Sequence, residues 1–502
     1  MTSQLVILPI IIPLIGAAVA LLLRRYPRVQ AGWALGVMIT SATSSALLLA
    51  QVWRSGQPVV YQSGGWPAPF GITFVGDMLA AFMVLMCQLV LTLGIAYAMG
   101  SKDKVIGYPA FYPLFLTLAT GLTGAMLTGD LFNLFVFAEL LVFSGTILTA
   151  SSDDAYGAEA ALKYFYTSLI ASASLLLAVG VLYVSFGTLN MADLAARIAA
   201  NPGMPLVPVA IAFLLVTFMV KSAVFPFHFW QPDFHTAAPT AVSAMLSSVV
   251  VKLGVYGFLR MTTLLFVDQS PAIRALLVAL GLIGIVYGGL GAIGTHNAKR
   301  MLAYSTLAQV GFILVAVGWG TPLALAAALI FTFNHSLIKA AMLMLAGQVA
   351  SRAPVKTASF EVVQGLGKYM PLSGALFFVG GLALAGIPPT NGFISKMTLF
   401  QSGILAEQWE SLALLGLASI FTLIYVIRAF MRIWWQPAAG PASGAGDTPA
   451  IKPYGDRLLA PALLIVGVLV LGLWPEPLVS LALAVSQWLG DPAAYIAAVL
   501  GG

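Results

Sequence analysis

The sequence predicts an all-α polytopic membrane protein of about fourteen transmembrane helices. Hydrophobic residues make up 60% of the 502-residue chain and charged residues only 8%, whereas soluble proteins carry about 25% charged residues. The apolar residues fall into runs of about twenty, the length that crosses the hydrocarbon core of a bilayer. Lysines and arginines gather in alternate loops, as expected when basic loops stay on one side of a membrane.

The apolar runs, taken in order, give the expected spans. They are residues 4–23, 32–53, 74–99, 108–127, 130–150, 163–186, 205–225, 240–263, 272–294, 299–319, 321–348, 371–399, 409–434 and 458–474. Prolines interrupt the seventh and twelfth, which are therefore expected to be broken helices lining a polar cavity. The apolar tail 476–501 is too interrupted to count as a fifteenth span. Only residues 436–457 have linker composition, so no soluble domain is expected.

The distribution of basic residues sets the orientation. With the N-terminus outside, fifteen lysines and arginines fall on the inside and four on the outside, namely Arg54, Arg197, Arg260 and Arg274. This bias follows the positive-inside rule and places both termini outside. It also explains the formal net charge of +6 without a nucleic-acid partner. Asp77, at the start of the third span, is interpreted as an interfacial anchor.

Titratable residues inside the spans are the candidate functional residues. They are Glu139, Lys221, Lys252, His335, Lys339 and Lys396. Glu139 lies nine residues after Asp130, about 13 Å down a helix and close to the bilayer midplane. Burying a charge in hydrocarbon costs roughly 3 kcal/mol or more, so such residues are normally kept for a function. Lysine is tunable by its surroundings and arginine is not, which favours a protonatable relay.

The turn that follows Lys221 offers a candidate entrance for protons. His228, Asp233 and His235 lie in a proline-rich stretch that the orientation places on the inside. Structural interpretations compete with these assignments. His228 and His235 suit capping or packing as well as proton transfer, His335 could bond a backbone carbonyl, and Lys339 could snorkel to the interface.

Other chemistry has no support in the sequence. No HExxH, CxxC, GxGxxG or Walker-type run is present, so hydrolysis, redox chemistry and nucleotide binding are not indicated. The single Cys87 excludes an intrachain disulfide framework and a cysteine-ligated cluster. We therefore expect no cofactor, no metal site and no enzymatic activity in this chain.

The order of the broken helices predicts an internal repeat. A five-span unit with a broken helix bearing Lys221 is followed by a second unit with a broken helix bearing Lys396. Because each unit has an odd number of spans, the second is inverted, an arrangement typical of transporters. The expected segments are a three-helix start (1–105), the two five-helix repeats (106–265 and 266–436), and a linker with the final helix and tail (437–502).

Several runs of residues resemble one superfamily. They are GDLFNLFVFAELL, VKSAVFPFHFWQPDFHTAAPTAVSAMLSSVVVKLGVYG, KRMLAYSTLAQVGF, FNHSLIKAAMLMLAG and GIPPTNGFISK. They are similar to the antiporter-like membrane subunits of respiratory complex I, membrane-bound hydrogenases and Mrp-type cation/proton antiporters. The stretch from Gly365 to Phe400 most resembles the D-type subunits of Mrp antiporters. Several complex I subunits of the M type carry glutamate where this chain has Lys396, which favours the D type and other complex I subunits instead.

The resemblance implies a role for each candidate residue. Glu139 matches a fifth-helix glutamate paired with the seventh-helix lysine, here Lys221, and Lys252 links two half-channels. His335 and Lys339 match polar eleventh-helix residues, and Lys396 leads to the far exit. The implied function is proton translocation in a multisubunit Na⁺/H⁺ antiporter of a bacterial-type cell membrane, with other membrane subunits as partners. A redox-driven proton pump and a mainly structural scaffold subunit are the alternatives.

Overall fold

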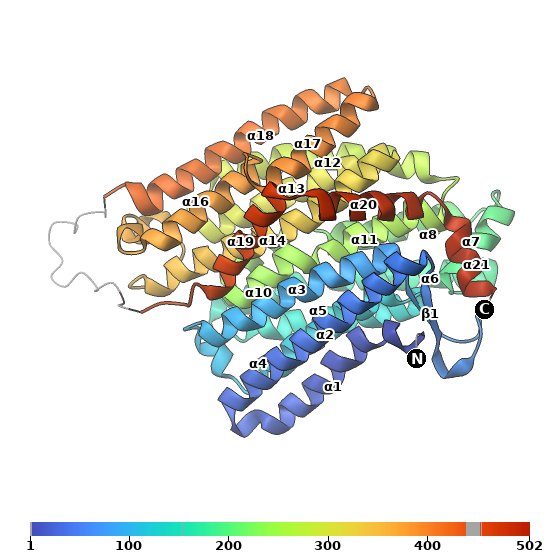
Figure 1. The fold of residues 1–502 in the computed structure, drawn as a ribbon, viewed down its shortest axis with the longest axis horizontal. Helices are drawn as coiled ribbons and strands as arrows, with labels where there is room; N and C mark the ends of the chain where they lie inside the picture. Colours follow the sequence, from blue (N-terminus) through green and yellow to red (C-terminus); the bar gives the residue numbers. More distant parts are fainter. Residues whose placement is uncertain (1–2, 153, 438–451, 453, 502) are drawn as a thin grey trace.

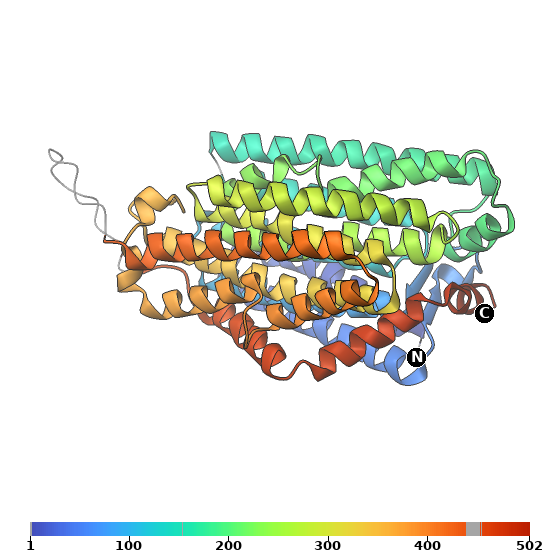
Figure 2. The ribbon, with the colours of Figure 1, turned by 90° about the horizontal axis from the view of Figure 1, so that it is seen from above.

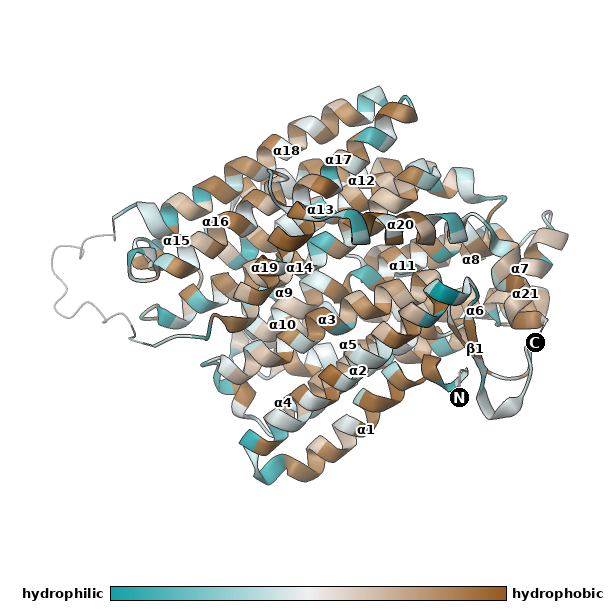
Figure 3. Cartoon of the chain, in the orientation of Figure 1, coloured by the Kyte–Doolittle hydropathy of each residue, from teal (hydrophilic) through white to brown (hydrophobic). Residues whose placement is uncertain are grey.

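The computed structural model describes residues 3–152, 154–437, 452 and 454–501, and it is a bundle of apolar helices. Most helices run roughly side by side along the long axis of Figure 1. Hydrophobic residues cover their length, and hydrophilic ones gather mainly in the connecting loops (Figure 3). Among the described residues, ten helices are long and apolar enough to cross a membrane, or eleven if one bent pair counts as a span. The predicted class of membrane protein is therefore confirmed.

The first part of the chain leads into a span at the centre of the bundle. Its elements are α1 (Leu8–Leu22), α2 (Pro27–Ser55), β1 (Val59–Gln62), β2 (Thr73–Gly76), α3 (Met78–Gly100), α4 (Phe111–Leu127), α5 (Leu131–Ala150), α6 (Ala155–Phe186), α7 (Met191–Ala200), α8 (Val207–Lys221) and α9 (Trp230–Ala237). The central span joins α10 (Thr240–Met245), a π-helical turn (Leu246–Val250), α11 (Lys252–Arg260) and a second π turn (Met261–Leu265). It is buried along its length.

The second part surrounds this span with longer helices. Its elements are α12 (Ser270–Gly294), α13 (Ala298–Trp319), α14 (Pro322–Arg352), α15 (Phe360–Val363), α16 (Pro371–Ala385), α17 (Asn391–Leu405), α18 (Trp409–Phe430) with a π turn (Met431–Trp435), α19 (Leu459–Leu473), α20 (Glu476–Leu489) and α21 (Pro492–Leu500). Helices α13 and α14 are also mostly buried, whereas less than half of the apolar span is buried in α1, α6, α12 and α18. In Figure 2 the teal α6 and the red α19 and α20 lie on opposite edges.

Three elements depart from the hydropathy-based prediction. Strands β1 and β2 form an antiparallel hairpin with Val59 opposite Gly76, so residues 73–76 are strand and the third span begins only at Met78. Helix α7 is a short amphipathic helix that no apolar run indicates. Helix α20 follows α19 at an angle of 78°. The predicted linker 436–457 lies mostly outside the described residues.

Both predicted helix breaks are present. Helix α8 ends at Lys221 and helical structure resumes at Trp230, and α16 and α17 are separated by residues 386–390. Each break contains a residue in the left-handed region: Ala223 with φ 52° and Gly386 with φ 81°. Alanine rarely adopts this conformation, because its Cβ then crowds the following carbonyl. The chain therefore turns sharply just after Lys221.

The bundle has two distinct ends. Both chain termini and the β hairpin lie at one end, which we call the terminus end (Figure 1). The last turn of α18 and the start of α19 lie at the other, which we call the linker end. Basic residues in loops, such as Lys102, Lys104 and Lys356, belong to the linker end, where they line a shared cavity with Lys452.

Glycine lets α8 and α11, which carry Lys221 and Lys252, approach closely. A Cβ built on Gly254 of α11 would lie 1.9 Å from the Ser222 hydroxyl and 2.5 Å from the Phe218 carbonyl oxygen. No side chain fits there without displacing the end of α8. Gly254 therefore fixes the distance between the segments that carry Lys221 and Lys252.

We predict that Gly254→Ala lowers the thermal unfolding temperature in detergent. The added methyl overpacks a buried contact, which typically costs about 1–3 kcal/mol. Gly36→Ala is the matched control, because a Cβ there meets nothing within 4 Å and alanine favours the helix. Equal unfolding temperatures for the two variants would contradict the close approach.

Candidate functional site

Two residues far apart in the sequence meet at the centre of the bundle. Lys252 Nζ lies 2.7 Å from His335 Nδ1, with both side chains buried. Lys252 Nζ also lies 3.5 Å from the carbonyl oxygen of Ser247, which belongs to the π-helical turn before Lys252. An amine and an imidazole at hydrogen-bond distance can pass a proton between them. Residues Lys221, Lys252, His335, Lys339 and Lys396 are called the polar axis below.

Lys339 extends the polar axis toward α13. It lies one helical turn after His335 on α14, and its Nζ donates to Leu302 O at 3.0 Å and to Ser305 Oγ at 2.9 Å. Ser305 in turn shares a 2.8 Å hydrogen bond with the Tyr425 hydroxyl. Lys339 is completely buried, so it does not snorkel to an interface.

Lys396 lies at the second helix break. Its Nζ donates to Ala385 O, at the end of α16, at 2.8 Å, and to Ser419 Oγ at 3.0 Å. The negative end of a helix dipole favours a cation at this position. A small cavity of about 10 Å³ is lined by both His335 and Lys396. That is about the volume that holds one water molecule, so the two residues can communicate through a single water.

Two asparagines join the second break to α14. Asn334, next to His335, donates to Asn391 O and Ser395 Oγ, both at 2.9 Å, and Asn391 donates back to Asn334 Oδ1 at 3.0 Å. All three side chains are buried. This network fixes the start of α17 and hence the position of Lys396 relative to His335.

Glu139 and Lys221 do not form a direct ion pair in the described residues. Glu139 instead accepts a hydrogen bond from Ser172 of α6. The neighbouring Ala171 carbonyl accepts from Thr217 of α8 at 3.2 Å, one turn before Lys221. Lys221 Nζ is buried and makes no hydrogen bond in the described structure. Helix α6 therefore mediates between Glu139 and the helix that carries Lys221.

The three residues predicted to form an entrance have different surroundings. Asp233 forms ion pairs with Lys163 at 2.8 Å and Arg300 at 2.9 Å. His228 stacks on Phe225 and meets the Tyr287 ring edge-on, in a packing role. His235 is fully buried, and its backbone carbonyl and Nδ1 both lie within 3.3 Å of the Ser243 hydroxyl.

The linker end has a polar cavity of about 580 Å³, close to the predicted entrance but lined by other residues. Residues 236–239, directly after His235, line it, whereas His228 and Asp233 do not. Its lysines are Lys102, Lys104, Lys299, Lys356 and Lys452. Asp103 pairs with Lys356 at 2.6 Å. Lys299 is buried and lies 3.4 Å from Ala238 O.

Hydroxyl groups lead from the cavity side toward the polar axis. Ser243 and Ser247 lie four residues apart on the central span, so Ser247 is about one helical turn nearer to Lys252 than Ser243 is. Ser247 shares a 2.6 Å hydrogen bond with Thr306 of α13. Hydroxyls both donate and accept, so such a series can carry protons with intervening water.

The structure overturns the interpretation of Asp77 as an interfacial anchor. Asp77 is fully buried and accepts two hydrogen bonds from Arg260, both at 2.7 Å. Arg260, predicted in an outer loop, is itself buried at the end of α11. The two residues are 183 positions apart in the sequence, so hydropathy alone gives no sign of their contact.

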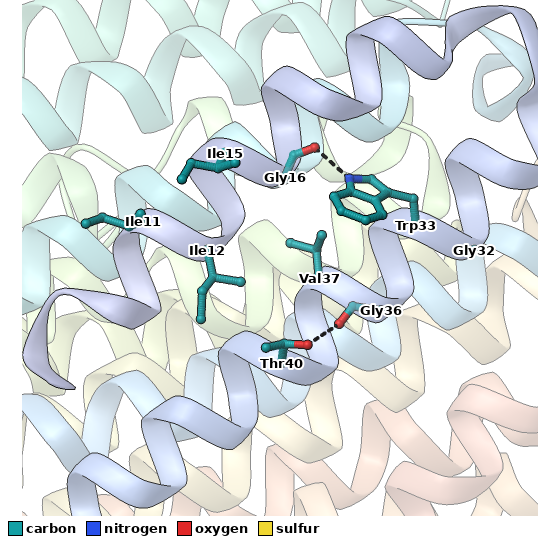
Figure 4. A pocket seen from close by; sticks show the side chains of 9 residues that line it. All are labelled: Ile11, Ile12, Ile15, Gly16, Gly32, Trp33, Gly36, Val37 and Thr40. Atoms are coloured by element: carbon teal, nitrogen blue, oxygen red, sulfur yellow. Dashed lines mark hydrogen bonds between the residues drawn. The ribbon is translucent and has the colours of Figure 1, made fainter. Parts of the chain in front are cut away.

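A separate apolar groove lies between α1 and α2. It encloses about 510 Å³ and is lined by Ile11, Ile12, Ile15, Gly16, Gly32, Trp33, Gly36, Val37 and Thr40 (Figure 4). None of these side chains is titratable. The groove therefore has no part in the polar axis.

Sequence reasoning missed the neutral polar residues of the site. Ser172, Ser305, Asn334 and Asn391 each hold a titratable residue or its helix in place. Their only signal in the sequence is the occurrence of polar side chains within apolar runs. Among the described residues, no group of three or more His, Cys, Asp or Glu side chains is placed to hold a metal ion.

Comparisons with known proteins agree with this architecture. Residues 128–422 match the family model for the transmembrane part of NADH:quinone oxidoreductase and Mrp antiporters. The chain is 32% identical to the D subunit of the Na⁺/H⁺ antiporter of Alkalihalophilus pseudofirmus, over 99% of both chains. It is 34% identical to the N subunit of the NADH-quinone oxidoreductase of Desulforudis audaxviator, over 96% of this chain and 98% of the relative.

A solved structure supports the same relationship. A chain of the Mrp complex from Dietzia sp. DQ12-45-1b superimposes with a TM-score of 0.89 at 30% identity, over 100% of this chain and 99% of that one. The match therefore extends along the complete bundle, both helix breaks included. The chain belongs to the NADH:quinone oxidoreductase/Mrp antiporter transmembrane family.

Proposed function

We propose that the chain is a proton-translocating, D-type subunit of a multisubunit Na⁺/H⁺ antiporter, and so part of a secondary transporter rather than an enzyme. The observation that carries this proposal is the contact between Lys252 and His335, joined through a one-water cavity to Lys396. This series of protonatable groups lies within a chain that is similar over its full length to the D subunit of an antiporter.

The proposed topology has fourteen spans, with both termini outside. It comprises an N-terminal segment (1–105), two inverted repeats (106–265 and 266–436) and a C-terminal segment (437–502). The shared end of the two termini and the matching breaks after Lys221 and before Lys396 support it. The linker end is then the inner side, in accord with its lysines.

In the proposed mechanism a proton enters from the inner side and leaves through the second repeat. The cavity at the linker end is the opening, and Ser243 and Ser247 lead from it toward Lys252. Lys252 passes the proton to His335, from which it reaches Lys396 through the one-water cavity. Lys339 tunes this transfer, because a second positive charge nearby disfavours protonation of its neighbours.

Lys221 and Glu139 control the first repeat. A positive charge on Lys252 disfavours protonation of Lys221, whereas the carboxylate of Glu139 favours it. Proton movement along the polar axis therefore changes the protonation of Lys221. Ser172 holds Glu139 away from direct pairing. We assign the movement of Na⁺ to a site completed by partner subunits, because the polar axis contains mainly cationic side chains.

A component of a redox-driven proton pump is the second candidate. The 34% identity to the N subunit of an NADH-quinone oxidoreductase favours it. Purification of the native complex separates the two: iron–sulfur subunits that copurify with the chain support the pump, and their absence together with Na⁺-dependent proton exchange supports the antiporter.

We predict that Lys252→Arg abolishes exchange while the complex still assembles. Arginine keeps the positive charge but does not release its proton, so proton transfer to His335 stops and the rate falls by about a hundredfold or more. The measurement is Na⁺-driven proton flux in vesicles that contain the intact complex. Lys368→Arg, at an exposed lysine, is the control. Wild-type exchange by Lys252→Arg, Lys221→Ala and Lys396→Ala would leave only the scaffold interpretation.

Gly386→Ala is expected to reduce exchange by displacing Lys396. A Cβ there would lie 2.5 Å from Lys396 Cδ, on a residue whose φ is 81°. Gly416→Ala on the neighbouring α18 meets nothing within 4 Å and serves as the control. Unchanged flux in a fully assembled Gly386→Ala complex would show that Lys396 does not need its present position.

Blocking the linker-end cavity is expected to stop exchange. Thr357→Cys lines the cavity, whereas the exposed Glu361→Cys lies nearby but outside it. A bulky, membrane-impermeant thiol reagent applied from the inner side should inhibit the first variant and spare the second, because Cys87 is buried. Equal sensitivity of the two variants would place the opening elsewhere.

A further inference from the structure

We propose that Arg260, held by Asp77, is the residue that prevents a proton on Lys252 from leaving directly through the first repeat. The inference rests on the proposed proton-translocating function but concerns a different part of the chain, at the terminus end. It makes Arg260 a determinant of direction: protons that reach Lys252 must continue through the second repeat.

Lys252 and Arg260 share one face of α11. Tyr256 lies between them at four-residue spacing, and the eight-residue separation of Lys252 and Arg260 corresponds to about 12 Å along the helix. The Tyr256 hydroxyl donates to Met126 O at 2.7 Å and accepts from Arg260 Nε at 2.9 Å. This face is therefore a polar route that runs from Lys252 toward the terminus end.

The ion pair closes this route with groups that do not relay protons. Both oxygens of Asp77 are fully bonded: Oδ1 accepts from Arg260 and from Ala80 N at 2.9 Å, and Oδ2 accepts from Arg260 and from Trp488 Nε1 at 3.1 Å. Four donors therefore occupy the acceptor positions of this carboxylate. A guanidinium does not lose its proton in proteins.

The C-terminal helices cover the pair from the terminus end. The Arg260 guanidinium carbon lies 5.0 Å from the centre of the Tyr256 ring and 5.1 Å from that of the Tyr495 ring on α21. Trp488 comes from α20. Burial raises the pKa of the Tyr495 hydroxyl, so it stays neutral beside the guanidinium. These rings pack around the guanidinium, and only 5% of the Arg260 side chain stays exposed.

A purely stabilising role is the competing explanation, because a buried ion pair also fixes the helices that it joins. Similar stability is often reached with apolar residues, so stability alone does not require the pair. The two explanations differ in one measurable quantity, the passive proton permeability of the assembled complex. A fixed charge that obstructs a pore suppresses that permeability.

The test is a proton leak measured without Na⁺. Vesicles that contain the intact complex receive a pH gradient, and its decay is followed with a pH-sensitive dye. Arg260→Gln is expected to raise the leak severalfold, and Lys252→Ala in the same chain is expected to remove that increase. Arg197→Gln, which removes the exposed Arg197 from its pair with the buried Asp193 on α7, is the control and should leak like the wild type.

A wild-type leak in an assembled Arg260→Gln complex overturns the proposal, as does a leak that persists after Lys252→Ala. If Arg260→Gln does not assemble, Trp488→Phe carries the test. That change removes one donor to Asp77 and keeps an aromatic ring, and it should give a smaller increase in leak, with a wild-type leak again overturning the proposal. Failure of the antiporter function itself would appear separately, as wild-type exchange by Lys252→Arg.

Discussion

The cost of placing an ammonium group in hydrocarbon governs the arrangement of this protein. Three lysines of the polar axis meet this cost with main-chain carbonyls and hydroxyls rather than carboxylates: Lys252 near Ser247 O, Lys339 on Leu302 O and Lys396 on Ala385 O. Such partners accept a hydrogen bond from either the charged or the neutral amine. A carboxylate would instead favour the charged form strongly. The choice of partner therefore leaves these lysines free to gain and lose a proton.

Irregular backbone supplies two of these three carbonyls. A regular helix uses its carbonyls internally, whereas those at helix ends and breaks lack an intrahelical partner. The end of α16 serves Lys396, and the π turn of the central span lies against Lys252. The prolines and glycines that disturb the apolar runs are thus part of the solvation of the polar axis.

These features explain what the sequence alone could predict. The membrane class, the two breaks and the titratable residues within the spans follow from composition, because charges and prolines are rare in apolar runs and stand out. Contacts between distant segments do not follow. The sequence predicts His335 as a polar helix residue, but its 2.7 Å contact with Lys252 depends on how α14 packs on the central span. Asp77 and Arg260 each lie at the edge of an apolar run, so hydropathy places them at the interface rather than in contact. The β hairpin and α7 contain no apolar run long enough to indicate them.

The central span has two unlike halves, and this difference determines where a proton on Lys252 can go. On the linker side the central span carries Ser243 and Ser247. Their hydroxyl groups can donate and accept hydrogen bonds, and they lie between the cavity and Lys252. On the terminus side the same span carries Tyr256, which donates to the Met126 carbonyl, and Arg260, which donates to the carboxylate of Asp77. One half suits proton transfer and the other does not. The remaining hydrogen-bond partner at transfer distance is His335, on a different helix. In the proposed mechanism a proton therefore crosses sideways from α11 to α14, which links the helices on the two sides of the central span in a single path.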